Sequence, residues 1–148
     1  MSILLECKVG QGKRALIVDD EPTVGHVMSR VLEHMGYEVD CVLDGQQAMH
    51  MAKESHYSTV ICDILMPGLN GMALYETWQE ECPELVERTI FVTGDCLGFE
   101  VNEFLARTGA RCIFKPFKLD DLARLVAELQ TTPERSGAVA APNQHLAT

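Results

Sequence analysis

The sequence has little positive charge. It contains 12 Lys and Arg residues against 22 Asp and Glu residues, which gives a formal net charge of −10 with the histidines neutral. Phosphate backbones and anionic membrane surfaces attract proteins with a surplus of Lys and Arg. We therefore expect this domain to bind no nucleic acid and to make no membrane contact. Any anion that it binds must be held by a local arrangement of groups.

Long apolar runs are absent as well. No stretch approaches the roughly 20 apolar residues of a membrane-spanning helix. The segment after Met1 has neither the charged start nor the long apolar core of a signal peptide. These absences predict a cytoplasmic protein. The chain has 148 residues, of which 47% are hydrophobic and 6% aromatic, and this suits one globular domain with an adequate core.

The cysteine and histidine patterns of metal sites are also missing. The cysteines form no CxxC pair and no Cys/His cluster with zinc-ligand spacing, so we interpret them as reduced, mostly buried thiols. The histidines have no second ligand at a suitable offset, which favours structural roles over metal binding or catalysis. These residues are Cys7, Cys41, Cys62, Cys82, Cys96 and Cys112, and His26, His34, His50, His56 and His145.

What the sequence does contain is an alternation of short apolar runs with segments of helical period. The runs predict strands, and apolar residues spaced three and four apart follow them, as on one face of a helix. Five strands that alternate with five helices through short loops predict an α/β domain with a parallel sheet covered on both faces. The runs are ALIV (15–18), YEVDCV (37–42), TVIC (59–62), TIFVT (89–93) and RCIFKPF (111–117).

Local signals predict where helices start and which residues they bury. Asp44, with Gln47 three residues later, resembles a capping box that opens a helix through Ala52, and Asn70 can cap the helix after it. The first and the last helix should each bury one apolar face. The residues expected on these faces are Val24, Val27, Met28, Val31, Leu32 and Met35 in the first helix, and Leu119, Leu122, Leu125, Val126 and Leu129 in the last.

Polar residues stand where the predicted strands end. Asp19 and Asp20 follow the first, Asp63 ends the third, Thr93 ends the fourth and Lys115 ends the fifth. The carboxyl ends of parallel strands share one edge, where ligands bind. Carboxylates about 5 Å apart repel by a few kcal/mol at an effective dielectric constant near 20, so the cluster favours protons or a cation such as Mg²⁺. With a lysine and a hydroxyl to hold an oxyanion, the set is typical of a phosphoryl-transfer site.

Four fragments in this order resemble the response-regulator receiver domain of two-component, or phosphorelay, signalling. They are LIVDDEP (16–22), DILMPGLNG (63–71), FVTGD (91–95) and FKPF (114–117). The resemblance implies a flavodoxin-like (βα)5 fold, a doubly wound parallel five-stranded sheet of order 2-1-3-4-5. It places the receiver domain at 13–130, after an N-terminal lead at 1–12. The Ala-, Pro-, Thr- and Ser-rich segment 131–148 has no apolar period and predicts a disordered tail.

The resemblance implies a role for each acid. Asp63 would be the nucleophile that takes a phosphoryl group from the phosphohistidine of a sensor histidine kinase or a histidine phosphotransfer domain, forming an acyl phosphate. Asp19, Asp20 and Asp63, with the backbone carbonyl of Leu65, would hold Mg²⁺. The chain would be a self-phosphorylating and self-dephosphorylating switch rather than an enzyme that acts on a separate substrate.

Two further residues complete the implied site. Thr93 would hydrogen-bond the bound phosphoryl group. Lys115 would pair with Asp63 before transfer and with a phosphoryl oxygen after it. The Lys115–Pro116 peptide bond is expected to be cis, as in the family, because X–Pro is the only common setting for that isomer.

Two positions depart from the family pattern. Receivers usually carry Tyr or Phe three residues before the lysine, whereas this chain has Cys112, so we expect a muted or rerouted rearrangement of the face from strand four to helix five. Leu65, two residues after Asp63, cannot orient a water molecule, which suggests a slow loss of phosphate. Asp95, two residues after Thr93, offers an acid that could position one.

Alternatives to this interpretation stay open. The segment FLARTGARCIFKPF (104–117) looks most like the carboxyl-terminal receiver of a hybrid histidine kinase. A stand-alone receiver and a receiver cut from a longer regulator are the other choices, and a homodimer is possible. A degenerate receiver that acts only as a protein-interaction module is favoured by Cys112 and opposed by the intact Asp63, Thr93 and Lys115. A flavin-binding electron carrier and a haloacid-dehalogenase-like phosphatase share the fold type. DDEP would repel a flavin phosphate, and its adjacent acids differ from the DxD pattern of the phosphatase.

Overall fold

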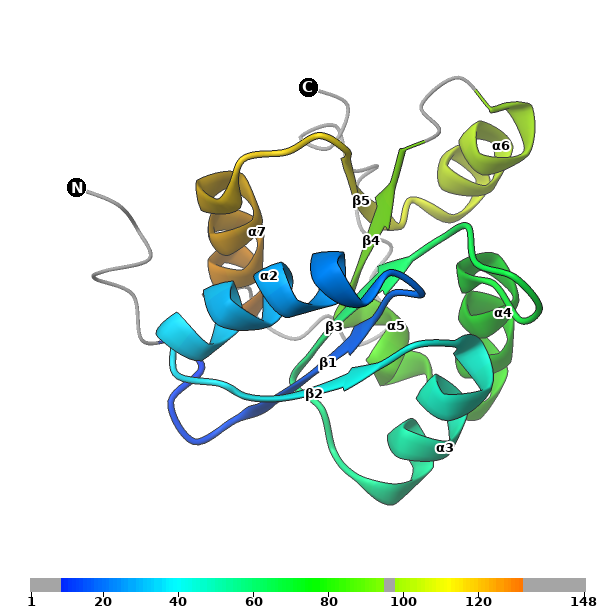
Figure 1. Ribbon diagram of the computed structural model, residues 1–148. Helices are drawn as coiled ribbons and strands as arrows, with labels where there is room; N and C mark the ends of the chain where they lie inside the picture. The colour runs from blue at the N-terminus through cyan, green and yellow to red at the C-terminus, as the bar shows by residue number, and fades with distance from the viewer. Residues whose placement is uncertain (1–8, 95–97, 132–148) are drawn as a thin grey trace.

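The computed structural model describes residues 9–94 and 98–131, which Figure 1 shows in colour. All but the first residue of the predicted tail, and most of the predicted lead, lie outside the described residues. So do Cys7, Asp95, Cys96 and His145. The boundaries expected for the lead, the domain and the tail therefore stay predictions.

A single parallel sheet organises the chain. Its strands lie in the order β2-β1-β3-β4-β5, which confirms the predicted order 2-1-3-4-5. Every residue of β3 and β4 is buried, because strands in the middle of such a sheet are covered on both faces. The strands are β1 (Arg14–Val18), β2 (Glu38–Val42), β3 (Thr59–Asp63), β4 (Thr89–Thr93) and β5 (Arg111–Phe114).

Helices cover both faces of the sheet (Figure 1). Alternate residues of β1 point into two separate cores: Ala15 and Ile17 pack with α2 and α7, whereas Leu16 and Val18 pack with the helices of the other face. The first layer consists of α2 (Pro22–His34) and α7 (Leu119–Thr131), and the second of α3 (Gly45–Glu54), α4 (Gly71–Glu81), α5 (Pro83–Glu87) and α6 (Phe99–Thr108).

The predicted helix caps are present. Asp44 Oδ1 accepts a hydrogen bond from the Gln47 backbone N–H at 2.8 Å, and the Gln47 side chain returns to the backbone N–H of Leu43 at 2.9 Å. The returning bond reaches the residue before the cap instead of the cap itself, so the capping box is slightly shifted. Asn70 Oδ1 accepts from the Ala73 N–H at 3.0 Å and starts α4 immediately after the loop that follows Asp63.

The structure corrects three expectations. The described residues contain six helices instead of five, because α5, which starts at Pro83, was not predicted. Val27 and Leu119 are each 40% exposed, although both were expected on buried faces. Val27 lies at the margin of the stripe that α2 buries, and Leu119 is the first residue of α7.

The expectation of mostly buried thiols is met by only half of the described cysteines. Cys62 and Cys112 are buried, Cys82 is half-buried and Cys41 is exposed; all four are free thiols.

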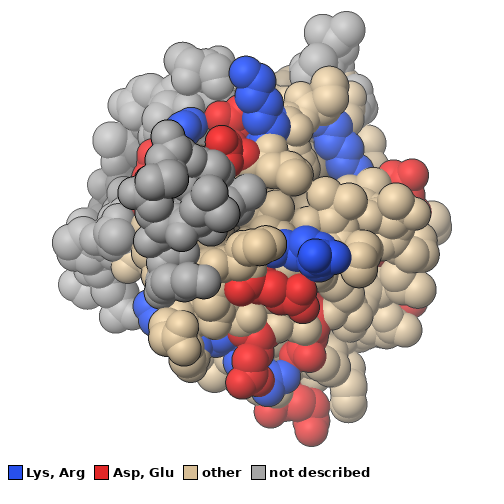
Figure 2. Space-filling view, turned by 60° about the vertical axis from the view of Figure 1, so that its left-hand side comes forward, with Lys and Arg blue, Asp and Glu red and all other residues tan. Residues whose placement is uncertain are grey.

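Among residues 9–94 and 98–131, no helix combines the length and the apolar character needed to cross a membrane. On the face shown in Figure 2, the Lys and Arg side chains lie scattered, several beside acidic ones, and form no continuous basic area. The expected absence of nucleic-acid binding and of membrane contact stays a prediction.

Two buried helical glycines differ in the space around them. A Cβ on Gly71, the first residue of α4, would lie 2.8 Å from Ile64 Cα and 2.9 Å from the carbonyl oxygen of Asp63. Glycine therefore lets α4 start against the backbone that carries Asp63, and the Gly71 N–H donates to the Ile64 carbonyl at 2.8 Å. A Cβ on Gly25 in α2 would meet no atom closer than 3.9 Å.

This difference predicts opposite effects of alanine at the two glycines. Gly71→Ala should lower the free energy of unfolding by about 1–3 kcal/mol, because backbone atoms of the β3–α4 loop must shift. Gly25→Ala should raise it by up to about 1 kcal/mol, because alanine favours a helix interior over glycine. Urea denaturation followed by circular dichroism measures both. An equal effect of the two substitutions would contradict the close approach at Gly71.

Candidate functional site

The ends of four strands meet at one edge of the sheet. Backbone hydrogen bonds continue the ladder one residue past the strands: Ile64 N–H donates to Val92 O at 2.9 Å, and Lys115 N–H donates to Thr93 O at 2.8 Å. These bonds hold the backbone directly after Asp63 against β4, and the backbone directly after β5 against Thr93. The parallel pairing therefore brings together residues that are far apart in the sequence.

Three carboxylates cluster at this edge. Asp19, Asp20 and Asp63 each place one carboxylate oxygen within 4.8 Å of the others. Asp19 and Asp63 are buried, whereas Asp20 is exposed. No other group of three His, Cys, Asp or Glu side chains with this spacing occurs in residues 9–94 and 98–131.

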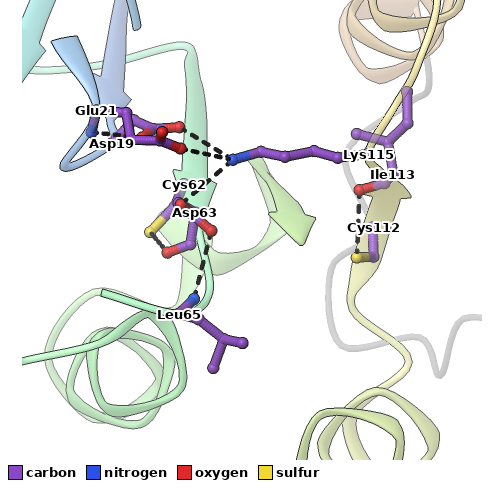
Figure 3. A network of polar contacts seen from close by, with 8 residues as sticks. All are labelled: Asp19, Glu21, Cys62, Asp63, Leu65, Cys112, Ile113 and Lys115. Atoms are coloured by element: carbon purple, nitrogen blue, oxygen red, sulfur yellow. Dashed lines mark hydrogen bonds and ion pairs between the residues drawn. The ribbon is translucent and has the colours of Figure 1, made fainter. Parts of the chain in front are cut away.

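One lysine, directly after β5, faces the cluster. Lys115 Nζ lies 3.5 Å from Asp63 Oδ2, 3.7 Å from Asp19 Oδ2 and 3.8 Å from Glu21 Oε1, as Figure 3 shows. Its peptide bond to Pro116 is cis, which confirms the expectation. Sequence reasoning had not included Glu21. The signal that could have found it is its place directly after Asp19 and Asp20, at the same strand end.

Burial raises the pKa of the two inner acids, Asp19 and Asp63. It raises the pKa of Asp63 from 3.8 to about 6, while Lys115 acts in the opposite direction and Asp19 adds to the rise. Burial likewise raises the pKa of Asp19, against the hydrogen bond from the Glu21 backbone N–H and the charge of Lys115. One lysine therefore compensates the buried negative charge only in part.

The residues present fit a hard divalent cation. All three side-chain donors are carboxylate oxygens, the ligand type that Mg²⁺ prefers. Asp19 Oδ2 is buried and accepts no hydrogen bond from any described residue, so it has capacity for a ligand besides its 3.7 Å contact with Lys115. The Leu65 backbone borders the cluster, since its N–H donates to Asp63 Oδ1 at 3.3 Å.

Thr93 and Cys112 complete the described site. Thr93 is buried at the end of β4, the strand next to Asp63, whereas Asp95 lies outside the described residues. Cys112 is buried on β5 and is paired in register with Phe91 of β4. No aromatic ring of β5 therefore stands at the position where the family usually has one.

Aromatic rings from other elements pack on this side of the sheet. Phe104 of α6 meets Phe91 edge to face at a centroid distance of 5.6 Å and Tyr75 of α4 at 5.2 Å. The space beside Cys112 is thus bordered by a ring on β4 that also contacts two helices.

The parallel sheet of order 2-1-3-4-5, with an acid cluster and a lysine at its carboxyl edge, defines the class of receiver domains. A family model described as response regulator receiver domain matches residues 15–127. This chain belongs to the response regulator receiver domain family of two-component signalling.

Two curated relatives show where such domains occur. The chain is 33% identical over 114 residues to the sensor protein EvgS of Escherichia coli K12, which is 77% of this chain and 9% of EvgS. It is 31% identical over 127 residues to the transcriptional regulatory protein TcrA of Mycobacterium tuberculosis, 82% of this chain and 47% of TcrA. The chain thus spans less than half the length of either relative.

Solved structures agree with the fold. The receiver domain of a signal transduction histidine kinase from Syntrophus aciditrophicus has a TM-score of 0.73 at 28% identity, covering 87% of this chain and 98% of that one. The response regulator TrrA of Thermotoga maritima, solved in complex with Mg²⁺ and BeF, has a TM-score of 0.69 at 27% identity, covering 79% and 98%.

The raised pKa of Asp63 predicts a pH-dependent stability in protein freed of metal by a chelator. A carboxyl group whose pKa is 3.8 unfolded and about 6 folded contributes stability that is fully present below about pH 4 and is lost as pH rises through about 6. Between pH 4.5 and 7.5 this group should remove about 1–3 kcal/mol from the free energy of unfolding.

Asp63→Asn should remove this part of the pH dependence and leave the protein more stable than the wild type at pH 7.5. Urea denaturation in EDTA across this pH range measures it. Glu33→Gln, an exposed acid near the end of α2, is the control and should keep the wild-type profile. Identical profiles for wild type and Asp63→Asn would contradict the effect of burial on Asp63.

Proposed function

We propose that this chain accepts a phosphoryl group on Asp63 in a Mg²⁺-dependent transfer from a phosphohistidine, and that the phosphorylated form switches partner interactions. The donor would be a sensor histidine kinase or a histidine phosphotransfer domain. The observation that carries the proposal is the position of Lys115 Nζ, 3.5 Å from Asp63 Oδ2 and 3.7 Å from Asp19 Oδ2, beside three clustered carboxylates.

The chemistry follows from these positions. A carboxylate oxygen of Asp63 attacks the phosphorus atom, the P–N bond breaks, and its electron pair leaves with the imidazole, so that an acyl phosphate forms on Asp63. Asp19, Asp20, Asp63 and the Leu65 carbonyl would hold Mg²⁺, which when bound supplies positive charge against the phosphoryl oxygens. Lys115 exchanges its contact with Asp63 for a phosphoryl oxygen, and Thr93 donates its hydroxyl hydrogen to another.

This role is that of a switch rather than of an enzyme with a separate substrate. The acyl phosphate is formed and lost on the same carboxylate, so no separate substrate is converted. The second candidate is a degenerate receiver that serves only as an interaction module. It is favoured by Cys112, which cannot fill a pocket as an aromatic ring does, but the arrangement of Asp63 and Lys115 opposes it.

The setting of the domain is part of the proposal. The similarity to the sensor protein EvgS and to the receiver domain of a histidine kinase favours a hybrid histidine kinase as the parent chain. Such a receiver would act in the cytoplasm, where its phosphohistidine donor is located. A homodimer is compatible with this setting.

The proposed transfer can be tested without the natural kinase. Incubation with Mg²⁺ and acetyl phosphate should add one phosphoryl group, seen by intact mass spectrometry, and EDTA should prevent it. Asp63→Asn should abolish the added mass, while Asp121→Asn should leave it unchanged. Phosphorylation that persists in Asp63→Asn would refute Asp63 as the acceptor.

The side chain at position 65 predicts the lifetime of the acyl phosphate. Leu65 is 43% exposed, and its apolar side chain offers no hydrogen bond to an attacking water. Leu65→Asn should therefore shorten the lifetime several-fold, because an amide can orient water. The decay of the added mass after removal of the donor measures it, with Leu65→Met as the apolar control. An equal or shorter lifetime in the wild type would overturn this expectation.

A further inference from the structure

The ammonium group of Lys115 is shared among three acids. Its distances to Asp63, Asp19 and Glu21 are 3.5, 3.7 and 3.8 Å, all longer than the 2.7–3.2 Å of a direct N–H···O hydrogen bond. Two of these acids belong to the site described above. Glu21 is the third, and no role in the proposed transfer has been assigned to it.

The backbone of Glu21 is held in place. Its N–H donates to Asp19 Oδ1 at 2.8 Å, its φ and ψ of −100° and 107° are extended, and Pro22 begins α2 immediately after it. The Glu21 side chain caps no backbone N–H group of α2. It instead reaches toward Lys115 (Figure 3).

Glu21 is the solvent-side partner of the lysine. Its side chain is 66% exposed, compared with 26% for Lys115, 8% for Asp63 and none for Asp19. An incoming phosphodonor must reach Asp63 from solvent, because the interior side of Asp63 is filled by the core. The Glu21 carboxylate therefore lies close to the ammonium group and on its solvent side.

We propose that Glu21 is a positioning residue that holds Lys115 in the unphosphorylated protein and competes with the incoming phosphoryl group for it. This inference rests on the proposed function. In the reaction with acetyl phosphate, Asp63 forms the new P–O bond, the bond from phosphorus to the acetyl oxygen breaks, and its electrons leave with acetate. Lys115 must turn from Glu21 to a phosphoryl oxygen as negative charge arrives, so Glu21 slows the transfer.

Three variants separate pairing from the general effect of charge. Glu21→Gln should raise the rate of phosphorylation by acetyl phosphate about two- to fivefold at saturating Mg²⁺, as expected for loss of one exposed charge near the reacting group. Glu21→Asp keeps the charge but shortens the side chain, so it should also be faster than the wild type. Glu33→Gln, an exposed acid near the other end of α2, is the charge-matched control and should leave the rate unchanged.

A second readout is independent of phosphorylation. In metal-free, unphosphorylated protein, the NMR signals of the terminal carbon and nitrogen of Lys115 should shift in Glu21→Gln and stay in place in Glu33→Gln. No shift in Glu21→Gln would overturn the pairing. An unchanged rate in Glu21→Gln, or a wild-type rate in Glu21→Asp, would overturn the competition. If the wild type takes no phosphoryl group at all, the proposed function fails, and the NMR comparison still decides the pairing.

Discussion

The structure depends on crowded negative charge at one edge of the sheet. Three carboxylates approach within 4.8 Å of one another, and two of them are buried. Charges in such a place are unfavourable unless a counter-charge is near. Lys115 supplies one positive charge to several acids, and the raised pKa values of Asp19 and Asp63 show that this compensation is incomplete. The site thus favours added positive charge, as protons or as a cation, before any partner arrives.

The fold produces this crowding with ordinary backbone geometry. Parallel pairing places the ends of β1, β3, β4 and β5 side by side, and single hydrogen bonds beyond the strands hold the next residues in line. The cores on the two faces anchor the strands, so that the acids cannot move apart to relieve their repulsion without disturbing packed side chains. Gly71 completes the arrangement, because only a residue without Cβ lets α4 start directly against the loop after Asp63.

Features that depend on local sequence pattern were predicted correctly. Contacts that depend on the length and direction of a side chain were not predicted. The bounds of β4 agree residue for residue, and the strand-end rule was enough to bring Asp19, Asp63 and Lys115 to one edge. The short helix α5 was missed because five residues hold no helical period. Glu21 was missed because its partner follows β5: its place after Asp19 and Asp20 indicates the strand end, but not the direction in which the side chain extends.

The small side chain of Cys112 changes how the site can influence the outer surface. Phe91 and Thr93 are two residues apart on β4 and so point to the same face of the sheet, where Phe91 lies beside Cys112 and meets the rings of Tyr75 and Phe104. Each such ring pair stabilises its contact by about 0.5–1.5 kcal/mol. A displacement of β4 at Thr93 would therefore act on α4 and α6 through Phe91 without needing an aromatic ring on β5. The muted or rerouted rearrangement expected from the sequence stays a prediction, and these three rings offer a route for its rerouted form.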